Sequence, residues 1–158
     1  MPPQLSDELR QTRPFGSSEE ELYLGVQRSA ALLAVEIRQV LKEAGLSEPQ
    51  YNVLRILTGA GAAGLPSQEI GVRMVTPVPD VTRLVDRLEK AELVERRRES
   101  DDRRIVRVLV TPAGKRLAKR LAPKLLEAHS AQLGHLSAQD QKTLTRLLGK
   151  ARELPHSS

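Results

Sequence analysis

Cysteine is absent from this 158-residue sequence, and aromatic residues are scarce, with two Tyr, one Phe and no Trp. Without cysteine the chain can form no disulfide, no thiolate metal site and no thiol-based redox switch. The shortage of aromatic rings argues against a base-stacking platform for single-stranded nucleic acid. The core must be built from Leu, Val, Ile and Ala, which favours helices packed on helices.

Long apolar runs are also missing, and the N-terminal segment lacks the apolar core of a signal peptide. We therefore expect a cytoplasmic protein with no membrane partner. Hydrophobic residues make up 39% of the chain and charged residues 28%, which is typical of a folded soluble domain. The formal net charge of +5 suits a polyanionic partner, although it could equally serve solubility.

The motifs of catalysis and cofactor binding are missing or misplaced. Gly59, Gly61 and Gly64 spell GxGxxG, but a dinucleotide site needs that motif between a strand and a helix, and here it follows a predicted helix. His129 and His135 are not at the spacing that places two metal ligands on one helix face. No nucleophile, base and orienting group occur at a recognisable spacing. We predict no enzyme, no cofactor and no metal site.

Long helical regions are expected at 18–45 and 112–153, flanked by a flexible arm over 1–17 and a tail over 154–158. Ser18 is the expected N-cap of the first region. The apolar residues of that region recur every three or four positions, and a stripe of this length needs a long partner surface: Leu22, Val26, Ala30, Leu33, Ile37, Val40 and Leu41.

Residues 46–111 carry the pattern of a helix-turn-helix followed by a β-ribbon. One helix begins after Ser47, a short helix capped by Ser67 runs to about Met74, and a proline-rich turn covers 76–79. A further helix is expected from about Pro79 to Ala91, with apolar residues at i, i+3, i+4 and i+7. Three residues are expected to support the helix-turn-helix: Ser67, Gln68 and Thr76.

The opposite face of the helix near residues 79–91 is polar and suits the major groove of duplex DNA. Arginine can pair with guanine O6 and N7, and threonine can contact a phosphate or a thymine methyl group. Taken alone, an ordinary amphipathic helix with a solvated charged face would explain the pattern better. The residues predicted to face DNA are Thr82, Arg83, Asp86 and Arg87.

Two strands, 93–97 and 105–110, are predicted to hold out a charged tip. An arginine at such a tip can enter a narrow minor groove. The alternative is an edge hairpin whose charges prevent aggregation. The DNA interpretation is favoured because the tip directly follows the predicted recognition helix, and its candidate residues are Asp102, Arg103 and Arg104.

No acidic residue occurs between Arg103 and Leu126. Some of the cations in that stretch could contact phosphates, although a solvated helix surface is the preferred interpretation from Lys119 to Lys124. The cations are Lys115, Arg116, Lys119, Arg120 and Lys124.

The ordered set VTRLVDRLE (81–89), LVER (93–96), DRR (102–104) and VLVTPAG (108–114) resembles the MarR family, the multiple antibiotic resistance regulators. The resemblance extends over roughly residues 20–152. It implies a mainly α fold with a small β-wing: a winged helix-turn-helix with about six helices and a two- to three-stranded antiparallel sheet. It also places Thr82, Arg83 and Arg87 at the major groove and Arg104 at the wing, with Asp102 as its orienting carboxylate.

The resemblance further implies a homodimer in which the terminal helices of both subunits interlock, and a small-molecule effector such as an aromatic acid. The effector would enter between the dimerisation helices and the DNA-binding domain. The residues expected at the dimer interface are Leu22, Val26, Leu144, Leu147 and Leu148.

Two positions depart from the family pattern. Glu92 stands where a glycine is usual, and a non-glycine residue in a left-handed turn is strained by about 1 kcal/mol, so the local turn is expected to differ from the family's. The turn over 76–79 (TPVP) replaces small polar residues, so Pro79 and Asp80 are not expected to read bases. The leading interpretation is a dimeric regulator of transcription that binds a pseudo-palindromic operator, expected to be a repressor that a small-molecule ligand releases. It is weighed against two alternatives: a winged helix used for protein–protein contact, and a small enzyme or ligand-binding bundle.

Overall fold

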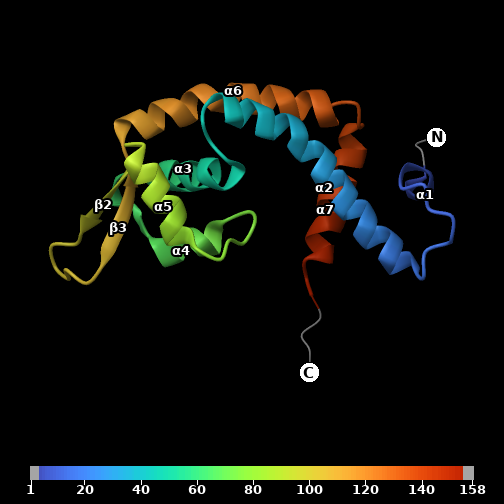
Figure 1. The fold of residues 1–158 in the computed structure, drawn as a ribbon, viewed down its shortest axis with the longest axis horizontal. Coiled ribbons are helices and arrows are strands. Elements are labelled where there is room, and N and C mark those ends of the chain that lie inside the picture. The colour runs from blue at the N-terminus through green and yellow to red at the C-terminus, as the bar shows by residue number, and fades with distance from the viewer. Residues whose placement is uncertain (1–3, 155–158) are drawn as a thin grey trace.

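The computed structural model describes residues 4–154. Helices and three short strands follow one another along the chain (Figure 1) as α1 (Leu5–Glu8), α2 (Ser18–Glu43), α3 (Glu48–Ala60), the 3-10 turn η1 (Gly61–Ala63), β1 (Leu65–Pro66), α4 (Ser67–Arg73), α5 (Val81–Lys90), β2 (Val94–Arg98), β3 (Val106–Val110), α6 (Pro112–Leu133) and α7 (Ala138–Ala151).

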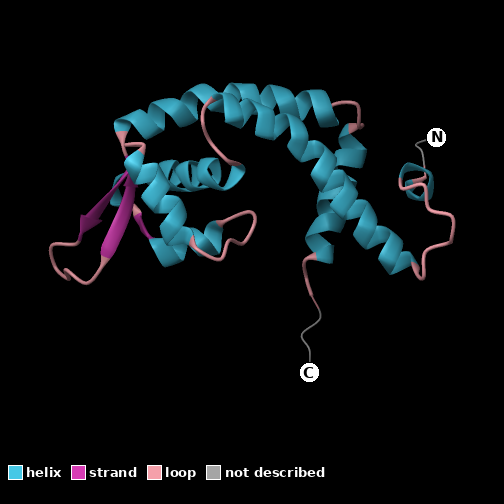
Figure 2. Ribbon diagram, viewed as in Figure 1, coloured by secondary structure: helices cyan, strands magenta, loops and turns pink. Residues whose placement is uncertain are grey.

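The molecule has two lobes, which the two long helices, α2 and α6, connect (Figure 1). Helices α3, α4 and α5 and the strands form one lobe, and α6 runs along its top edge (Figures 1 and 2). The C-terminal half of α6 lies beside α2, where the Gln132 side-chain amide donates to the Leu33 carbonyl at 2.9 Å. Among residues 4–154, none of the helices combines the length and apolar character that crossing a bilayer requires.

The three strands form one antiparallel sheet in the order β1-β3-β2. Val94 pairs with Val110 at the base of the β2–β3 ribbon and Arg98 with Val106 near its tip, while Leu65 of β1 pairs with Val108. This is the sheet of a winged helix-turn-helix, so the predicted fold class is confirmed. The described residues hold seven α-helices, and α1 is the one that the sequence did not predict.

The core lies inside the winged-helix lobe and is almost entirely aliphatic, as the shortage of aromatic residues predicted. Leu54 and Leu57 of α3 and Val85 of α5 are completely buried there. The same core includes Leu41 from α2 and Leu121 from α6. Because these two helices contribute to the core, each long helix is fixed to the lobe at one end.

The ends of several helices correct the sequence-based boundaries. Ser17, and not Ser18, caps α2, since its side chain accepts from the Glu20 amide at 3.2 Å. Ser67 is the first residue of α4 and makes no capping hydrogen bond, because Pro66 occupies the N-cap position. Helix α5 begins at Val81, two residues later than expected, after an Asp80 cap.

The arm over 1–17 contains one turn of helix, α1, which lies next to α2. Glu8 of the arm forms an ion pair with Arg28 of α2 at 3.5 Å. The arm's first three residues and the predicted tail, apart from Leu154, lie outside the described residues.

The expected departure of the turn at Glu92 is not observed, because Glu92 adopts the left-handed conformation of the family glycine, with φ of 59°. The turn is held by neighbours on both sides, because the Glu92 amide donates to Glu89 and the Thr111 hydroxyl donates to the Glu92 carbonyl at 2.8 Å. The surrounding contacts therefore enforce a conformation that costs a non-glycine residue roughly 1 kcal/mol.

Replacing Glu92 with glycine should relieve that strain. We expect Glu92→Gly to raise the free energy of unfolding by about 1 kcal/mol, measured by urea denaturation. Ala91→Gly is the matched control: Ala91 has φ of −81°, so glycine relieves nothing there and should leave stability unchanged or lower it. Equal effects of the two substitutions would show that the left-handed turn stores no strain.

Candidate nucleic-acid interface

Helix α5 divides into a buried and an exposed face as the sequence predicted. Val85 and Leu88 are buried in the core. The four residues predicted to face DNA are all exposed: Thr82, Arg83, Asp86 and Arg87. The Asp80 carboxylate accepts from the Arg83 amide at 3.0 Å and so fixes the start of the helix.

Strand β2 is attached to helix α5 through the side chain and the backbone amide of Arg96. Its guanidinium donates to Asp86 at 2.6 Å and to Glu89 at 2.5 Å, and its backbone amide donates to Glu89 at 3.2 Å. A fourth, longer contact reaches the Thr82 carbonyl at 3.4 Å. We call this set of contacts the Arg96 clamp. It joins α5 to the edge strand of the wing.

Electrostatics within the Arg96 clamp favour the charged guanidinium. Partial burial of the Arg96 side chain opposes its charge, but the hydrogen bonds and charges of Asp86 and Glu89 outweigh burial and raise the pKa of Arg96. Asp86 therefore has a partner within its own chain. Its predicted contact with DNA stays a prediction, and its observed contacts position the wing.

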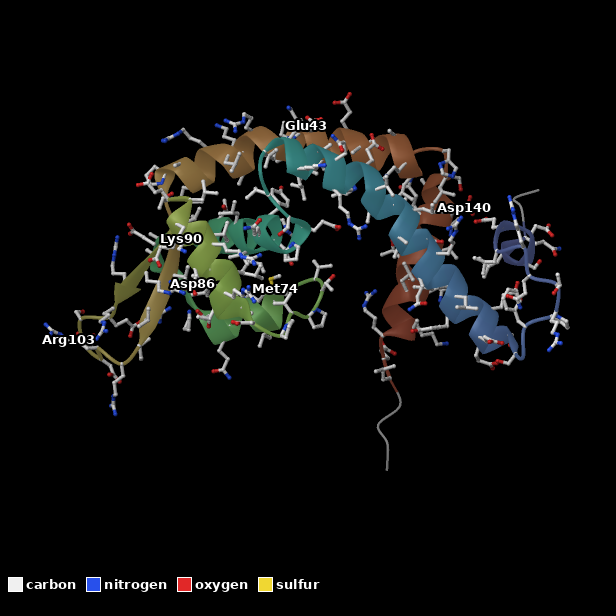
Figure 3. The ribbon with its side chains drawn as sticks, in the orientation of Figure 1. Glu43, Met74, Asp86, Lys90, Arg103 and Asp140 are labelled. Atoms are coloured by element: carbon white, nitrogen blue, oxygen red, sulfur yellow. The ribbon has the colours of Figure 1, made fainter. Side chains whose placement is uncertain are left out.

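The wing tip is ordered by Asp102, which accepts from the Arg104 backbone amide at 3.0 Å and from the Arg104 guanidinium at 3.2 Å. These contacts hold the pKa of the Asp102 carboxyl below its usual range. A lowered pKa means that the contact is present at neutral pH and is broken only in acid, as the carboxyl becomes protonated. Arg103 extends from the outer end of the wing (Figure 3).

The arginines of the ribbon separate into paired and unpaired groups. Arg97 pairs with Glu95, and Arg107 pairs with Glu99. Other arginines on the exposed surface of α5 and the wing form no ion pair within residues 4–154. They are Arg83, Arg87, Arg98 and Arg103. The sequence alone could not separate these groups, because partners two to ten residues away depend on strand register.

The three residues predicted to support the helix-turn-helix lie at the two ends of α4. Ser67 and Gln68 begin the helix, and Thr76 lies in the exposed turn that follows it. That turn is held by a residue the sequence did not reveal: the Asn52 side chain of α3, itself buried, accepts from the Val75 amide at 2.8 Å. Asn52 thus connects α3 to the segment that leads into α5.

A cavity of about 1180 Å³ lies between the long helices and the winged-helix lobe. Most of its wall is apolar, with side chains from α2 and α6, Leu46 and Pro49 from the start of α3 and the turn before it, and Met74 and Val75 from the segment that follows α4. Its polar lining, which the sequence did not reveal, consists of Arg38, Lys42, Ser47, Glu48, Tyr51, Asn52, Arg55, Thr76 and His129. Burial raises the pKa of the Tyr51 hydroxyl, and the nearby Arg55 partly offsets this.

The lobe formed by the N-terminal half of α2 and by α7 leaves apolar side chains uncovered. Leu22 is 65% exposed and Leu144 is 46% exposed, and α7 has no buried residue at all. Val26 and Leu147 are exposed as well, while Leu148 is half-buried. These are the five residues predicted for a dimer interface.

Comparison with known proteins identifies the architecture. A model of the MarR family matches residues 46–106. A solved MarR transcription factor from Planctomyces limnophilus is 36% identical; the match covers 86% of this chain and 98% of that one, with a TM-score of 0.66. The chain belongs to the MarR family. It is a DNA-binding regulator of transcription. Relatives such as FarR of Neisseria gonorrhoeae and PecS of Dickeya dadantii are HTH-type transcriptional regulators, which confirms the prediction that the chain is not an enzyme.

Two further MarR-like structures are similar in fold. Sco3205, a MarR family regulator from Streptomyces coelicolor solved in complex with DNA, is 23% identical, with 94% of each chain covered and a TM-score of 0.77. NadR in complex with 4-hydroxyphenylacetate is 25% identical, with 90% of this chain and all of that chain covered and a TM-score of 0.71.

Removing the Arg96 clamp should destabilise the wing without disturbing the core. We expect Arg96→Met to lower the free energy of unfolding by roughly 1 kcal/mol, because Asp86 and Glu89 are left side by side without a cation. Arg97→Met, on the same strand but more exposed, should change stability by much less. Urea denaturation of both variants tests this, and equal losses would contradict a special role for Arg96.

Proposed function

We propose that this MarR-family regulator binds a pseudo-palindromic operator as a homodimer and is a repressor that a small organic acid releases from DNA. The observation that carries the proposal is the exposed surface of α5, where Arg83 and Arg87 form no ion pair within the described residues. Exposed cations of this kind are free to pair with a polyanion, and arginine adds the geometry to read guanine.

Base reading is assigned to α5 and backbone or minor-groove contact to the wing. Arg83 and Arg87 lie one turn apart on the exposed face, so both can follow the floor of one major groove. Thr82 precedes them and suits a phosphate or a thymine methyl group. Arg103 and Arg104 lie at the wing tip, where Asp102 orients the second of them for the minor groove.

Dimerisation is supported by the uncovered apolar residues of α2 and α7. A lobe that exposes several leucines and buries none of its last helix needs a second surface. A second copy of the chain supplies an identical set of residues, which is the usual form of a two-fold interface. Two α5 helices would then read half-sites about 10 base pairs apart.

The cavity is the proposed effector site. Its apolar walls suit an aromatic ring, while Lys42 and Arg55, which form no ion pair among the described residues, suit a carboxylate. The structure of NadR with 4-hydroxyphenylacetate provides a relative whose ligand has this chemistry. A ligand releases DNA only if it binds the DNA-incompetent arrangement more tightly than the competent one.

Asn52 supplies a route from the cavity to α5. It lines the cavity and holds the Val75 amide, and Met74, Val75 and Thr76 line the same cavity. A ligand whose hydroxyl donates to the Asn52 Oδ1 in place of the Val75 amide would loosen the turn that sets the position of Asp80 and the start of α5. The effector would therefore change the orientation of α5 relative to the α5 helix of the second subunit.

Arg83→Ala should weaken binding to a duplex selected from a random pool by about 1–3 kcal/mol and relax the preference at one base position. Arg104→Ala, at the wing, should weaken all sequences alike and reduce the salt slope. Binding is measured by fluorescence anisotropy at several salt concentrations. A uniform loss for Arg83→Ala would reassign that residue to phosphate contact, and no duplex binding at low salt would favour a protein-binding module.

The effector assignment predicts a preference for the acid over its neutral analogue. In calorimetric titration, 4-hydroxyphenylacetate should bind at least about tenfold more tightly than 4-hydroxyphenylethanol, because Arg55 and Lys42 can pair only with the carboxylate. Arg55→Met should reduce affinity for the acid and leave the alcohol unchanged. Equal binding of acid and alcohol to the unaltered protein would contradict an acid-selective site.

A further inference from the structure

A second cationic surface lies on the N-terminal half of α6. Five cations, with no acid among them, are exposed there, and we call them the α6 basic face: Lys115, Arg116, Lys119, Arg120 and Lys124. Within the described residues none of the five forms an ion pair. The proposed operator surface uses none of them.

The α6 basic face points away from the winged-helix lobe. Successive helix residues are rotated by about 100°, which places Arg116, Lys119 and Arg120 roughly opposite the buried stripe of α6 and Lys115 and Lys124 on its two flanks. The buried residues are Gly114, Ala118, Leu121 and Leu125. Those buried residues pack onto the lobe, and α6 runs along the lobe's top edge with α4 and α5 below it (Figure 1). A duplex bound at α5 therefore leaves the α6 basic face accessible.

The arrangement works against the stability of the helix itself. Three pairs of like charge stand four residues apart, Lys115–Lys119, Arg116–Arg120 and Arg120–Lys124, and such pairs destabilise a helix. Lys115 also lies close to the N-terminus of α6, where the helix dipole disfavours cations and the first turn holds no acid. An anionic partner would relieve both costs.

The chemistry of the face selects among anionic partners. Protein interfaces depend on buried apolar or aromatic anchors, and no large hydrophobic residue is exposed between Pro112 and Leu125. Leu126, which follows this stretch, is exposed but lines the effector cavity. The five cations line neither the effector cavity nor the smaller cavity beside the wing, so a small anion finds no enclosure at them there. Two rows of cations extending about 14 Å along a helix suit the evenly spaced phosphates of duplex DNA.

We propose that the α6 basic face binds the phosphate backbone of a second DNA duplex, without sequence preference, so that one operator-bound dimer bridges two DNA segments. The bridging role depends on the proposed operator binding, whereas the α6 contact itself does not. Binding through α6 should be electrostatic and therefore steeply dependent on salt.

The experiment uses the full chain bound to a surface-attached duplex selected from a random pool. A fluorescent duplex of unrelated sequence, about 30 base pairs long, is then added at about 50 mM salt. The unaltered protein should recruit it. A variant combining Arg116→Ala, Arg120→Ala and Lys124→Ala should recruit it at least about tenfold more weakly, with a salt slope reduced by about 0.9 for each phosphate that is no longer neutralised. Its affinity for the attached duplex should stay within about twofold, since these residues lie away from α5.

The matched control combines Lys142→Ala, Arg146→Ala and Lys150→Ala in α7. It removes three exposed cations at the same spacing and lowers the formal net charge from +5 to +2, as the α6 variant does. The control should recruit the second duplex normally. Equal loss in both variants would attribute recruitment to net charge and overturn the proposal.

Two further arms separate the remaining outcomes. Arg83→Ala combined with Arg87→Ala removes the proposed base-reading residues but should still bind unrelated duplex through α6, so the two proposals fail independently. Polyglutamate is added as a competitor, and stronger competition by polyglutamate than by an equal charge of unlabelled duplex would indicate an acidic protein partner instead. No recruitment by the unaltered operator complex would also overturn the proposal.

Discussion

The arrangement of the wing depends on one arginine. Strand β2 is the edge of the sheet, so the amide of Arg96 has no strand partner on its outer side and donates instead to Glu89 of α5. The guanidinium of the same residue pairs with Asp86 and Glu89. These contacts satisfy one amide of the open strand edge and give the exposed face of α5 and the wing a fixed relative position. The proposed DNA surface has its shape because of this attachment.

The rest of the molecule links that surface to the long helices. Leu41 and Leu121 anchor α2 and α6 in the core of the lobe, while the outer half of α2 and all of α7 lack a buried side. A cavity lies where the two parts meet, and Asn52 connects its wall to the turn before α5. Ligand binding, dimer geometry and the position of α5 are thereby physically coupled in the proposed mechanism.

The sequence predicted the parts of the fold that follow from local pattern. Apolar spacing identified α5 and its exposed arginines, and Thr111 with Pro112 marked the start of α6 correctly. The loss of the family glycine at Glu92 suggested a different turn, and that expectation was wrong, because the left-handed turn is kept. The sequence-based prediction failed where two adjacent residues could equally cap a helix, as with Ser17 and Ser18. It also missed features that depend on tertiary contacts. The role of Arg96 required knowledge of which way the edge strand faces, and the cavity is lined by three separate helices and by the segments before α3 and after α4.

The central claim is that α5 and the wing form one unit through the Arg96 clamp, and the Arg96 amide reports on it directly. Hydrogen exchange of this amide, followed by NMR, should show protection, with an opening free energy equal to that of the α5 amides near Val85 and Leu88. Exchange of the Arg96 amide at the rate of an unprotected edge strand, while α5 stays protected, would contradict the account.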